Sequence, residues 1–216
     1  MFPGFEHPFT CVVAGPTQSG KTVFVQNILK GTHLYISPPP QKIVWCYGIQ
    51  NEAQMQQTKA MSNIPIEFFE GIPPLDMLSP NERTVIILDD LMEVAGKNKH
   101  VADLFTRGCH HRNASVFLLI QNLYHRGSKM RDIHTSCQYL FTAYNPRDSS
   151  FIQFLEKQCF PQWKNYLRQA YAHACRLPFG MLGIDFRQAT PNDRRVFSGC
   201  FPYQTFFYYR PTNWNF

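Results

Sequence analysis

The residues from Gly15 to Thr22 have the types and spacing that bind the phosphates of a nucleotide. They read GPTQSGKT and fit the pattern G-x-x-x-x-G-K-[ST] at every fixed position. The glycines let backbone N–H groups curl around phosphate oxygens at a helix N-terminus, where the helix dipole favours an anion. We expect Lys21 to reach the β- and γ-phosphates and the Thr22 hydroxyl to bind Mg²⁺. The candidate nucleotide-binding residues are therefore Gly15, Pro16, Thr17, Gln18, Ser19, Gly20, Lys21 and Thr22.

Two acidic residues, Asp89 and Asp90, follow the apolar run VIIL at 85–88. A buried strand that ends in an acid places the carboxylate at the carboxyl edge of a parallel sheet, beside a phosphate loop. We expect Asp89 to hold Mg²⁺, directly or through water, and Asp90 to polarise the attacking water. Glu is more often given this second task, and Asp is one methylene shorter. A solvated acidic turn is the alternative interpretation.

Gln121 ends another apolar run, SVFLLI at 115–120. A polar residue at this position can sense the γ-phosphate or orient the attacking water, if its strand lies next to the one that ends at Asp89. The alternative is an ordinary amide at the end of a strand.

The segment FTRGCHHRN at 105–113 precedes that strand and carries two arginines. Arg107 is a candidate for a residue that reaches the γ-phosphate of a neighbouring subunit. Such an arginine is worth about 10³–10⁵ in rate. A zinc site on Cys109, His110 and His111 is a weak alternative, because the ligands are adjacent and the sequence has no CxxC pair. A basic surface loop is the other alternative.

Apolar runs alternate with helical patterns along most of the chain. Strands are expected at 9–14, 42–47, 64–70, 83–88, 115–120 and 138–144, and helices at 21–30, 54–61, 101–106, 149–157 and 161–175. The strand at 64–70 should be peripheral because Pro65 cannot donate to a ladder. Beyond Gly180, edge strands are expected at 184–186, 195–197 and 205–209. This order predicts an α/β fold, with a mostly parallel central sheet and helices on both faces.

The composition supports one folded unit with a basic C-terminal part. The chain has 216 residues, 44% of them hydrophobic and 15% aromatic, which is enough for a full core. Its net charge is +6, and residues 147–216 hold 9 basic and 4 acidic side chains against 12 and 11 in residues 1–146. A basic segment favours a polyanionic partner such as nucleic acid or an anionic membrane, whereas ordinary solvated side chains are the alternative.

Basic residues beyond position 122 are candidate contacts to a phosphate backbone. They are Arg126, Lys129 and Arg131, and, among many aromatic residues, Arg194, Arg195 and Arg210. The aromatic residues themselves are more typical of a core or subunit interface than of base stacking.

Seven scattered cysteines, without a CxxC pair, favour a reduced intracellular chain over a disulfide scaffold. No apolar run approaches the roughly 18 residues that span a bilayer, and the first residues, MFPGFEHPFT, do not resemble a signal peptide. We therefore expect no membrane span.

Taken together, the motifs resemble those of the small genome-packaging ATPases of the FtsK–HerA superfamily. The segments GPTQSGKT, VIILDDL, FTRGCHHRNASVFLLIQNLYHRG and YLFTAYNPRD occur in that order. The chain looks most like the ATPases of Maverick/Polinton-type elements and related double-stranded DNA viruses, which are distant kin of the poxvirus packaging ATPase. The resemblance runs from about Phe9 to Phe160 and more weakly to Pro211. Many NTPases share the phosphate loop, whereas the block from HHRN to QN and the NPRD turn are specific.

The resemblance implies an additional-strand (ASCE) P-loop core at 1–146, with a helical, aromatic-rich extension at 147–216 packed on it. It also implies ATP and Mg²⁺ as ligands, a homo-oligomeric ring, double-stranded DNA threaded through that ring, and a capsid or portal-like vertex as a further partner. The expected location is the host cell, in its nucleus or cytoplasm, with the virion as a second location. No motif reads the nucleotide base, so the sequence does not select ATP over GTP.

Residue by residue, the family's motifs fall on the positions already identified. Lys21 and Thr22 match Walker A, Asp89 matches Walker B, Asp90 the catalytic acid and Gln121 the sensor.

The trans-acting arginine matches less well. The position eleven residues before Gln121, where more distant members carry this arginine, is His110 here. Arg107 and Arg112 flank it, and we assign the role to Arg107 with Arg112 as the second candidate.

Two other functions are consistent with a phosphate loop. The first is a monomeric P-loop kinase for a nucleotide or small molecule, which should have no strand between the first strand and the strand ending at Asp89. The strand at 115–121 is the natural insertion there, which favours an ATPase. The second is a non-catalytic P-loop adaptor in a virion, against which the intact set of Lys21, Thr22, Asp89 and Asp90 argues.

Overall fold

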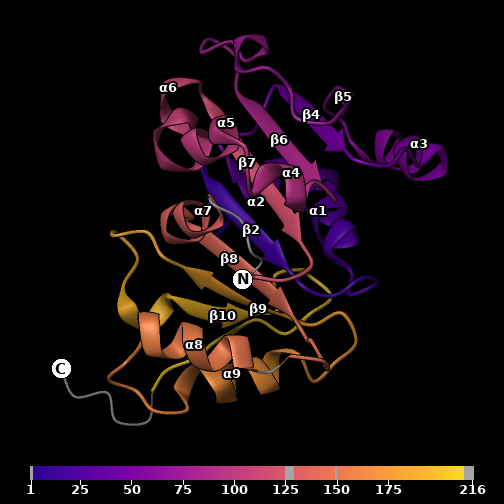
Figure 1. Cartoon of the computed structure of the whole chain (residues 1–216). Coiled ribbons are helices and arrows are strands. Elements are labelled where there is room, and N and C mark those ends of the chain that lie inside the picture. The colour runs from indigo at the N-terminus through magenta and orange to yellow at the C-terminus, as the bar shows by residue number, and fades with distance from the viewer. Residues whose placement is uncertain (1, 125–128, 149, 212–216) are drawn as a thin grey trace.

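Nine strands form the central sheet of the computed structural model, which describes residues 2–124, 129–148 and 150–211 (Figure 1). Their order is β11-β10-β9-β8-β2-β7-β6-β4-β5. The strands are β2 (Thr10–Ala14), β4 (Lys42–Tyr47), β5 (Ile66–Glu70), β6 (Thr84–Asp89), β7 (Ala114–Ile120), β8 (Tyr139–Ala143), β9 (Met181–Asp185), β10 (Val196–Ser198) and β11 (Phe207–Tyr208). The pairs from β5 to β8 are parallel, and those from β8 to β11 are antiparallel.

The position of β7 decides the class of the fold. It lies between β2, which leads into the phosphate loop, and β6, which ends at Asp89. This confirms the predicted additional strand, and the mostly parallel α/β sheet is confirmed with it. The peripheral strand is confirmed as well, because β5 forms one edge of the sheet.

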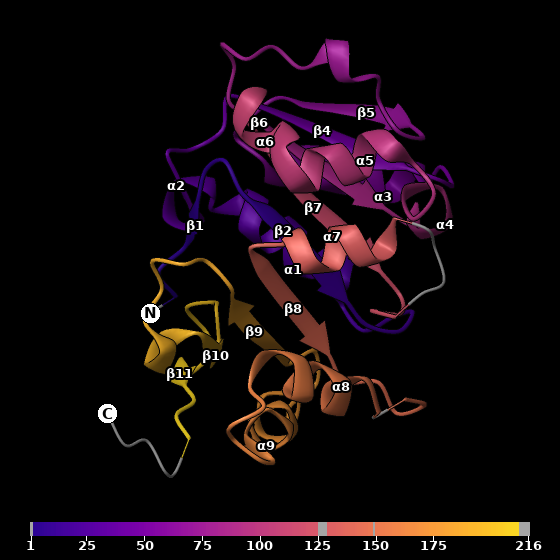
Figure 2. The same ribbon diagram turned by 60° about the vertical axis from the view of Figure 1, so that its left-hand side comes forward.

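Helices cover both faces of the sheet, as the two views show together (Figures 1 and 2). The helices of ten or nine residues are α1 (Lys21–Lys30), α3 (Glu52–Met61), α8 (Ser150–Cys159) and α9 (Tyr166–Ala174). The shorter ones are α2 (Thr32–Tyr35), α4 (Met92–Ala95), α5 (Lys99–Asp103), α6 (Cys109–His111) and α7 (Met130–Ser136), with a π-helical turn at Leu104–Gly108 and 3₁₀ turns at Leu75–Met77 and Asn192–Arg194. Among these described helices none is long and apolar enough to cross a membrane.

Side-chain alternation along the strands divides the core into two layers. In β2, Val12 belongs to the layer that includes residues of α5, α7, α8 and α9, whereas Val13 belongs to the layer that includes residues of α1. Leu118 and Leu119 of β7 divide in the same way. This period of two is what a parallel sheet buried on both faces requires.

The sequence patterns misplaced or missed some elements. The expected edge strand at 184–186 is the inner strand β9, which pairs with β8 and β10 and begins earlier, at Met181. The helix expected from residue 161 begins at Tyr166, because Asn165 before it is left-handed (φ 64°). Helix α7 and the small parallel pair of β1 (Phe5–Glu6) and β3 (Ile36–Ser37) were not predicted.

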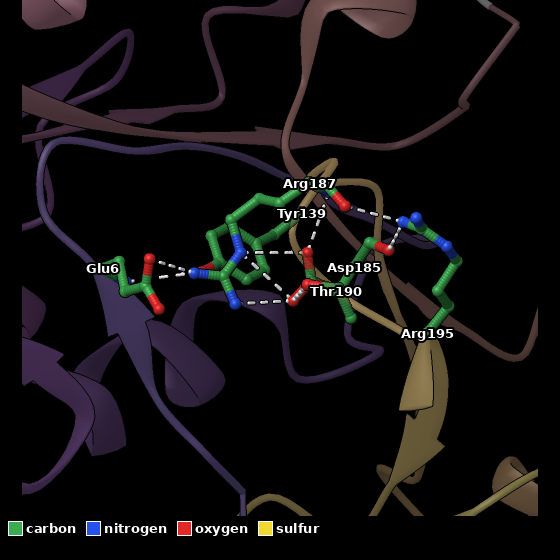
Figure 3. A network of polar contacts seen from close by, with 6 residues as sticks. All are labelled: Glu6, Tyr139, Asp185, Arg187, Thr190 and Arg195. Atoms are coloured by element: carbon green, nitrogen blue, oxygen red, sulfur yellow. Dashed lines mark hydrogen bonds and ion pairs between the residues drawn. The ribbon is translucent and has the colours of Figure 1, made fainter. Parts of the chain in front are cut away.

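The N-terminal arm is fastened to the C-terminal segment by a polar network at the end of the sheet where β8 begins (Figure 3). Arg187 forms ion pairs with Glu6 (2.6 Å) and with Asp185 (2.7 Å), and its guanidinium lies 4.9 Å from the centre of the Tyr139 ring. Arg195 donates to the carbonyl oxygens of Asp185 and Arg187. These two arginines are thus engaged within the chain.

The segment beyond residue 146 joins the core through β9, which pairs with β8 from Tyr139 to Ala143. The predicted aromatic core is confirmed at Phe197 and Phe201, which are buried against the layer that includes α1. The division of the chain at residue 146 itself stays a prediction.

Candidate active site

The phosphate loop leaves β2 after Ala14 and ends where α1 begins at Lys21. Gly20 caps the helix with φ 89°, a conformation that glycine adopts at little cost. At Gly15 a Cβ atom would lie 2.6 Å from Ser19 Oγ and 2.9 Å from Ala143 Cβ, so no side chain fits there. The Gly15 N–H donates to Ile120 O (3.0 Å), which joins the loop to the end of β7.

The side chain of Lys21 bonds back to the first residues of this loop. Its ammonium group donates to Gly15 O (2.8 Å) and Pro16 O (2.9 Å). Burial lowers the pKa of Lys21, while the charges of Asp89 and Asp90 oppose that shift. Because these loop carbonyls carry only partial charge, an anionic phosphate oxygen is a stronger partner for the ammonium group.

Thr22 and Asp89 meet at the point where a metal is expected. Thr22 Oγ1 donates to Asp89 Oδ2 (3.3 Å). Burial raises the pKa of the Asp89 carboxyl, with a smaller contribution from Asp90 and opposing ones from Thr22, Lys21 and Gln54. A hydroxyl and a carboxylate are the hard oxygen ligands that Mg²⁺ takes, usually while it keeps several waters.

The loop itself fits a nucleotide. Ser19 Oγ is buried and has no hydrogen-bond partner among the described residues, which is unusual for a native hydroxyl. Gly15 has no side chain, which lets the loop backbone pack closely against Ser19 and Ala143. The donor set of Lys21, Thr22 and Asp89 thus suits a triphosphate with its metal.

A cavity of about 630 Å³ brings the predicted residues together. Lys21, Thr22, Asp89, Asp90 and Gln121 all line it. They come from the start of α1 and from the carboxyl ends of β6 and β7, which are neighbours in the sheet.

Asp90, the second acid, has a left-handed backbone (φ 56°), which Asp tolerates better than most residues. Its conformation is compatible with the predicted role in activating water, and that role stays a prediction.

Gln54 is a cavity residue that the sequence patterns did not predict. Gln54 lines the cavity from α3, and its Nε2 donates to Asp89 Oδ2 (3.4 Å). Helix α3 is held against α1 by a buried hydrogen bond from Gln26 Nε2 to Thr58 Oγ1 (2.8 Å). No motif marks Gln54, because its position depends on how α3 packs.

The two candidate arginines lie near the other end of β7. Arg107 belongs to the π-helical turn and His110 to α6, and the side chains of both lie outside the described part of the structure. Arg112 follows α6 and precedes Ala114, whereas Gln121 follows Ile120. Arg112 and Gln121 therefore lie at opposite ends of one strand, so Arg112 is distant from the cavity of its own chain.

The described residues give no support to the zinc alternative. No group of three His, Cys, Asp or Glu side chains among them is placed to hold a metal ion. The Cys109 thiol is buried and faces the Phe9 carbonyl oxygen at 3.9 Å.

The candidate phosphate-backbone residues have mixed surroundings. Arg126 lies outside the described residues. Lys129 pairs with Asp132 (3.7 Å) and Arg210 with Asp193 (3.1 Å), whereas Arg131 and Arg194 are exposed. Part of the positive charge beyond residue 122 is therefore matched within the chain.

No protein-family model matches this sequence, and no curated protein matches it. Solved structures do. The DNA-packaging ATPase B204 from Sulfolobus turreted icosahedral virus has a TM-score of 0.55 at 13% identity, over 95% of this chain and 98% of that one. The genome packaging NTPase B204 from Sulfolobus turreted icosahedral virus 2 in complex with sulfate has a TM-score of 0.54 at 14% identity, over 94% and 97%.

The same protein in complex with AMPPCP gives a TM-score of 0.53 at 14% identity, again over 94% and 97%. At these identities the similarity shows the fold alone. This chain has the P-loop NTPase fold over nearly its whole length.

Proposed function

We propose that this chain is a Mg²⁺-dependent ATPase that translocates double-stranded DNA and packages a viral or virus-like genome. One observation carries the ATPase part of this proposal. Lys21, Thr22, Asp89, Asp90 and Gln121 line a single cavity at the carboxyl edge of the sheet. Each of these residue types matches a separate requirement of phosphoryl transfer to water.

The proposed chemistry follows from where each side chain lies. Lys21 neutralises charge that develops on the transferring phosphoryl group. Thr22 and Asp89 would hold Mg²⁺, which neutralises charge on the β- and γ-phosphates when bound. Asp90 accepts a proton from the attacking water, and Gln121 orients that water against the γ-phosphate.

The strand order favours an ATPase over the monomeric kinase. A kinase of the simple type has no strand between the phosphate-loop strand and the Asp89 strand, whereas β7 occupies that place here. In the proposed role, β7 also delivers Gln121 to the cavity. Intact acidic and basic groups argue likewise against a non-catalytic adaptor.

DNA packaging rests on two independent likenesses. The order of the motifs resembles that of FtsK–HerA packaging ATPases, and the fold is shared with B204, a DNA-packaging ATPase, over nearly the full length of both chains. By that analogy the working form is a homo-oligomeric ring around double-stranded DNA, and a capsid vertex is its docking partner.

All seven cysteines are free, and five of them are buried. That usage suits the reducing interior of a host cell, in the nucleus or cytoplasm. The virion is the second proposed location, because a packaging enzyme acts on the capsid.

The decisive experiment measures phosphate release from ATP with and without double-stranded DNA. We expect Mg²⁺-dependent hydrolysis that DNA stimulates, and a stimulation that weakens as salt rises because phosphate contacts release counterions. Light scattering after size-exclusion chromatography should detect assembly when nucleotide is present. Transfer of phosphate to a small acceptor by a monomer would instead establish the kinase.

A further inference from the structure

A second hollow adjoins the phosphate loop, on the other side of β2 from Asp89. It has a volume of about 440 Å³ and lies between the loop, the end of β8 and the segment that leads into β9. Its lining includes Gln18 and Ser19 of the loop together with Tyr144, Arg176 and Phe179. Gln18 also lines the catalytic cavity, so the two hollows meet at the loop.

Two aromatic side chains that line this second hollow are exposed to solvent. Tyr144 is 57% exposed and Phe179 is 69% exposed, although large apolar side chains gain by burial. Arg176 is exposed beside them. A hollow with two accessible rings and one guanidinium group suits a flat, partly polar ligand that stacks on them.

Phe179 is held against the loop in an unusual conformation. Its φ of 60° lies in the left-handed region, which is rare for a bulky side chain and costs about 1 kcal/mol or more. Its ring lies against Gly20, where an added Cβ atom would be 2.9 Å from Phe179 Cδ1. The backbone therefore presents this ring directly beside the N-terminus of α1.

A bound nucleoside triphosphate is long enough to extend from the catalytic cavity into the second hollow. Its γ-phosphate must face Asp90 and Gln121 in the catalytic cavity, and the phosphate chain must follow the loop. The remaining end, the nucleoside, then leaves the loop on the side away from Asp89. That side is the hollow between Tyr144 and Phe179.

We propose that the hollow lined by Tyr144, Arg176 and Phe179 binds the base and ribose of the nucleotide, an inference that rests on the proposed function. Aromatic stacking accepts any base, because each base has a π-face. The lining described contains no carboxylate, which is the group that would best accept the N–H donors of guanine. The site therefore selects little among bases, with ATP and GTP bound within a few-fold of each other.

Inorganic tripolyphosphate is the probe that separates the nucleoside site from the phosphate loop. Calorimetric titrations with Mg²⁺ should show that Phe179→Ala and Tyr144→Ala each weaken ATP binding roughly tenfold, the value of one stacking contact. Both variants should bind tripolyphosphate like the wild type, and Phe179→Tyr should keep wild-type ATP affinity. Phe179→Leu keeps apolar volume against Gly20 but lacks the ring, so it should behave like Phe179→Ala.

Tyr203→Ala is the matched control. Tyr203 is an aromatic residue, 74% exposed, that lines a separate hollow on which Phe179 also borders. Its removal should leave ATP affinity unchanged. Loss of affinity in Tyr203→Ala but not in Tyr144→Ala would place the base in that other hollow and overturn the assignment.

The remaining outcomes are distinct. Wild-type ATP affinity in both Phe179→Ala and Tyr144→Ala overturns the nucleoside site while leaving the ATPase intact. Equal loss of ATP and tripolyphosphate binding in those variants also overturns it, because the rings would then only support the loop. If the wild-type protein binds neither ligand, the proposed function itself fails.

Discussion

Gln54 donates a hydrogen bond to Asp89 Oδ2, the same oxygen that accepts one from Thr22. The two donors come from different helices, α3 and α1. Those helices are joined by the buried bond between Gln26 and Thr58. The carboxylate proposed to hold the metal therefore accepts hydrogen bonds from two helices that are joined to each other, and its orientation does not depend on its own strand alone.

This contact predicts that Gln54→Ala weakens metal binding more than it weakens catalysis. Losing a partner that orients a metal ligand typically costs about tenfold in metal affinity. We expect the Mg²⁺ concentration for half-maximal hydrolysis to rise by about that factor, with kcat at saturating Mg²⁺ nearly unchanged. Gln50→Ala is the control, since Gln50 lines the same cavity. A fall in kcat with unchanged Mg²⁺ dependence would contradict the orienting role.

Lys21→Ala and Asp89→Ala should each abolish Mg²⁺-dependent hydrolysis. In the proposed mechanism Lys21 brings positive charge to the phosphates and Asp89 holds the metal, so either loss should cost at least about 10²-fold in turnover. Phosphate release measures the effect, and circular dichroism checks the fold. Lys30→Ala, at the other end of α1, is the control. Wild-type turnover in a folded Lys21 or Asp89 variant would show that the site is wrongly assigned.

Asp90→Asn and Gln121→Ala should lower turnover much more than ATP affinity. Both residues are proposed to act on water rather than on the nucleotide, so about 10²-fold in kcat is expected, with a much smaller change in Kd. Asn also tolerates the left-handed backbone of position 90, so the substitution tests the carboxylate and not the turn. Parallel single-turnover and binding measurements separate the two effects. Loss of affinity alone would assign these residues to binding.

The predictable part of the site was the part that sits at strand ends. Asp89 and Gln121 each terminate an apolar run, and parallel strands bring their carboxyl ends to one edge, so their meeting followed from the sequence. The contact of Gln54 did not follow from the sequence. It depends on how α3 packs, which the spacing of apolar side chains does not specify. Phe179 was missed for another reason. Its proposed role depends on a left-handed backbone in a loop, which no periodic pattern reveals.

Elements that are fixed by long-range contacts could not be predicted from the sequence either. The strand pair β1 and β3 joins two dipeptides about thirty residues apart. The strand β9 was placed at an edge because its antiparallel pairing with β8 leaves no local trace. Charge counting, likewise, did not reveal that Arg187 and Arg195 are used inside the chain.

His134 predicts a loss of stability in mild acid. Its Nε2 is buried without a partner among the described residues, beside an apolar hollow of about 170 Å³ lined by Leu123, Leu140 and Leu155. Burial lowers the pKa of His134 to about 4, against about 6.5 in an unfolded chain. Between these two pH values the unfolded chain binds a proton at His134 that the folded chain does not bind. The free energy of unfolding therefore has its full value above about pH 6.5 and falls as the pH drops toward about 4.

His134→Phe should remove this dependence. Phenylalanine has no ring nitrogen to protonate and can keep the edge-on contact with Tyr124. Urea unfolding at pH 7.5 and 4.5 should show that the variant loses less stability than the wild type, by at most about 3 kcal/mol. His33→Phe, at an exposed position, is the control. Identical pH dependence in wild type and His134→Phe would refute the assignment.

The last prediction concerns Arg107 and the proposed ring. Arg112 and Gln121 lie at opposite ends of β7, so an arginine from this region is suited to the site of a neighbour rather than to its own. In a ring every contact is head-to-tail, and each subunit would supply one arginine to the next. Arg107→Ala and Lys21→Ala should therefore each be inactive alone but complement each other when mixed.

An equal mixture of the two variants should recover about one quarter of wild-type turnover, because that fraction of random interfaces pairs an intact Lys21 with an intact Arg107. The same mixture made with Arg112→Ala decides between the two arginines. Co-assembly must be shown by light scattering, and mixing Lys21→Ala with Asp89→Ala is the control that should recover nothing, since both lesions affect the same site. No recovery with either arginine variant would exclude a trans-acting arginine in this segment and favour the monomeric kinase.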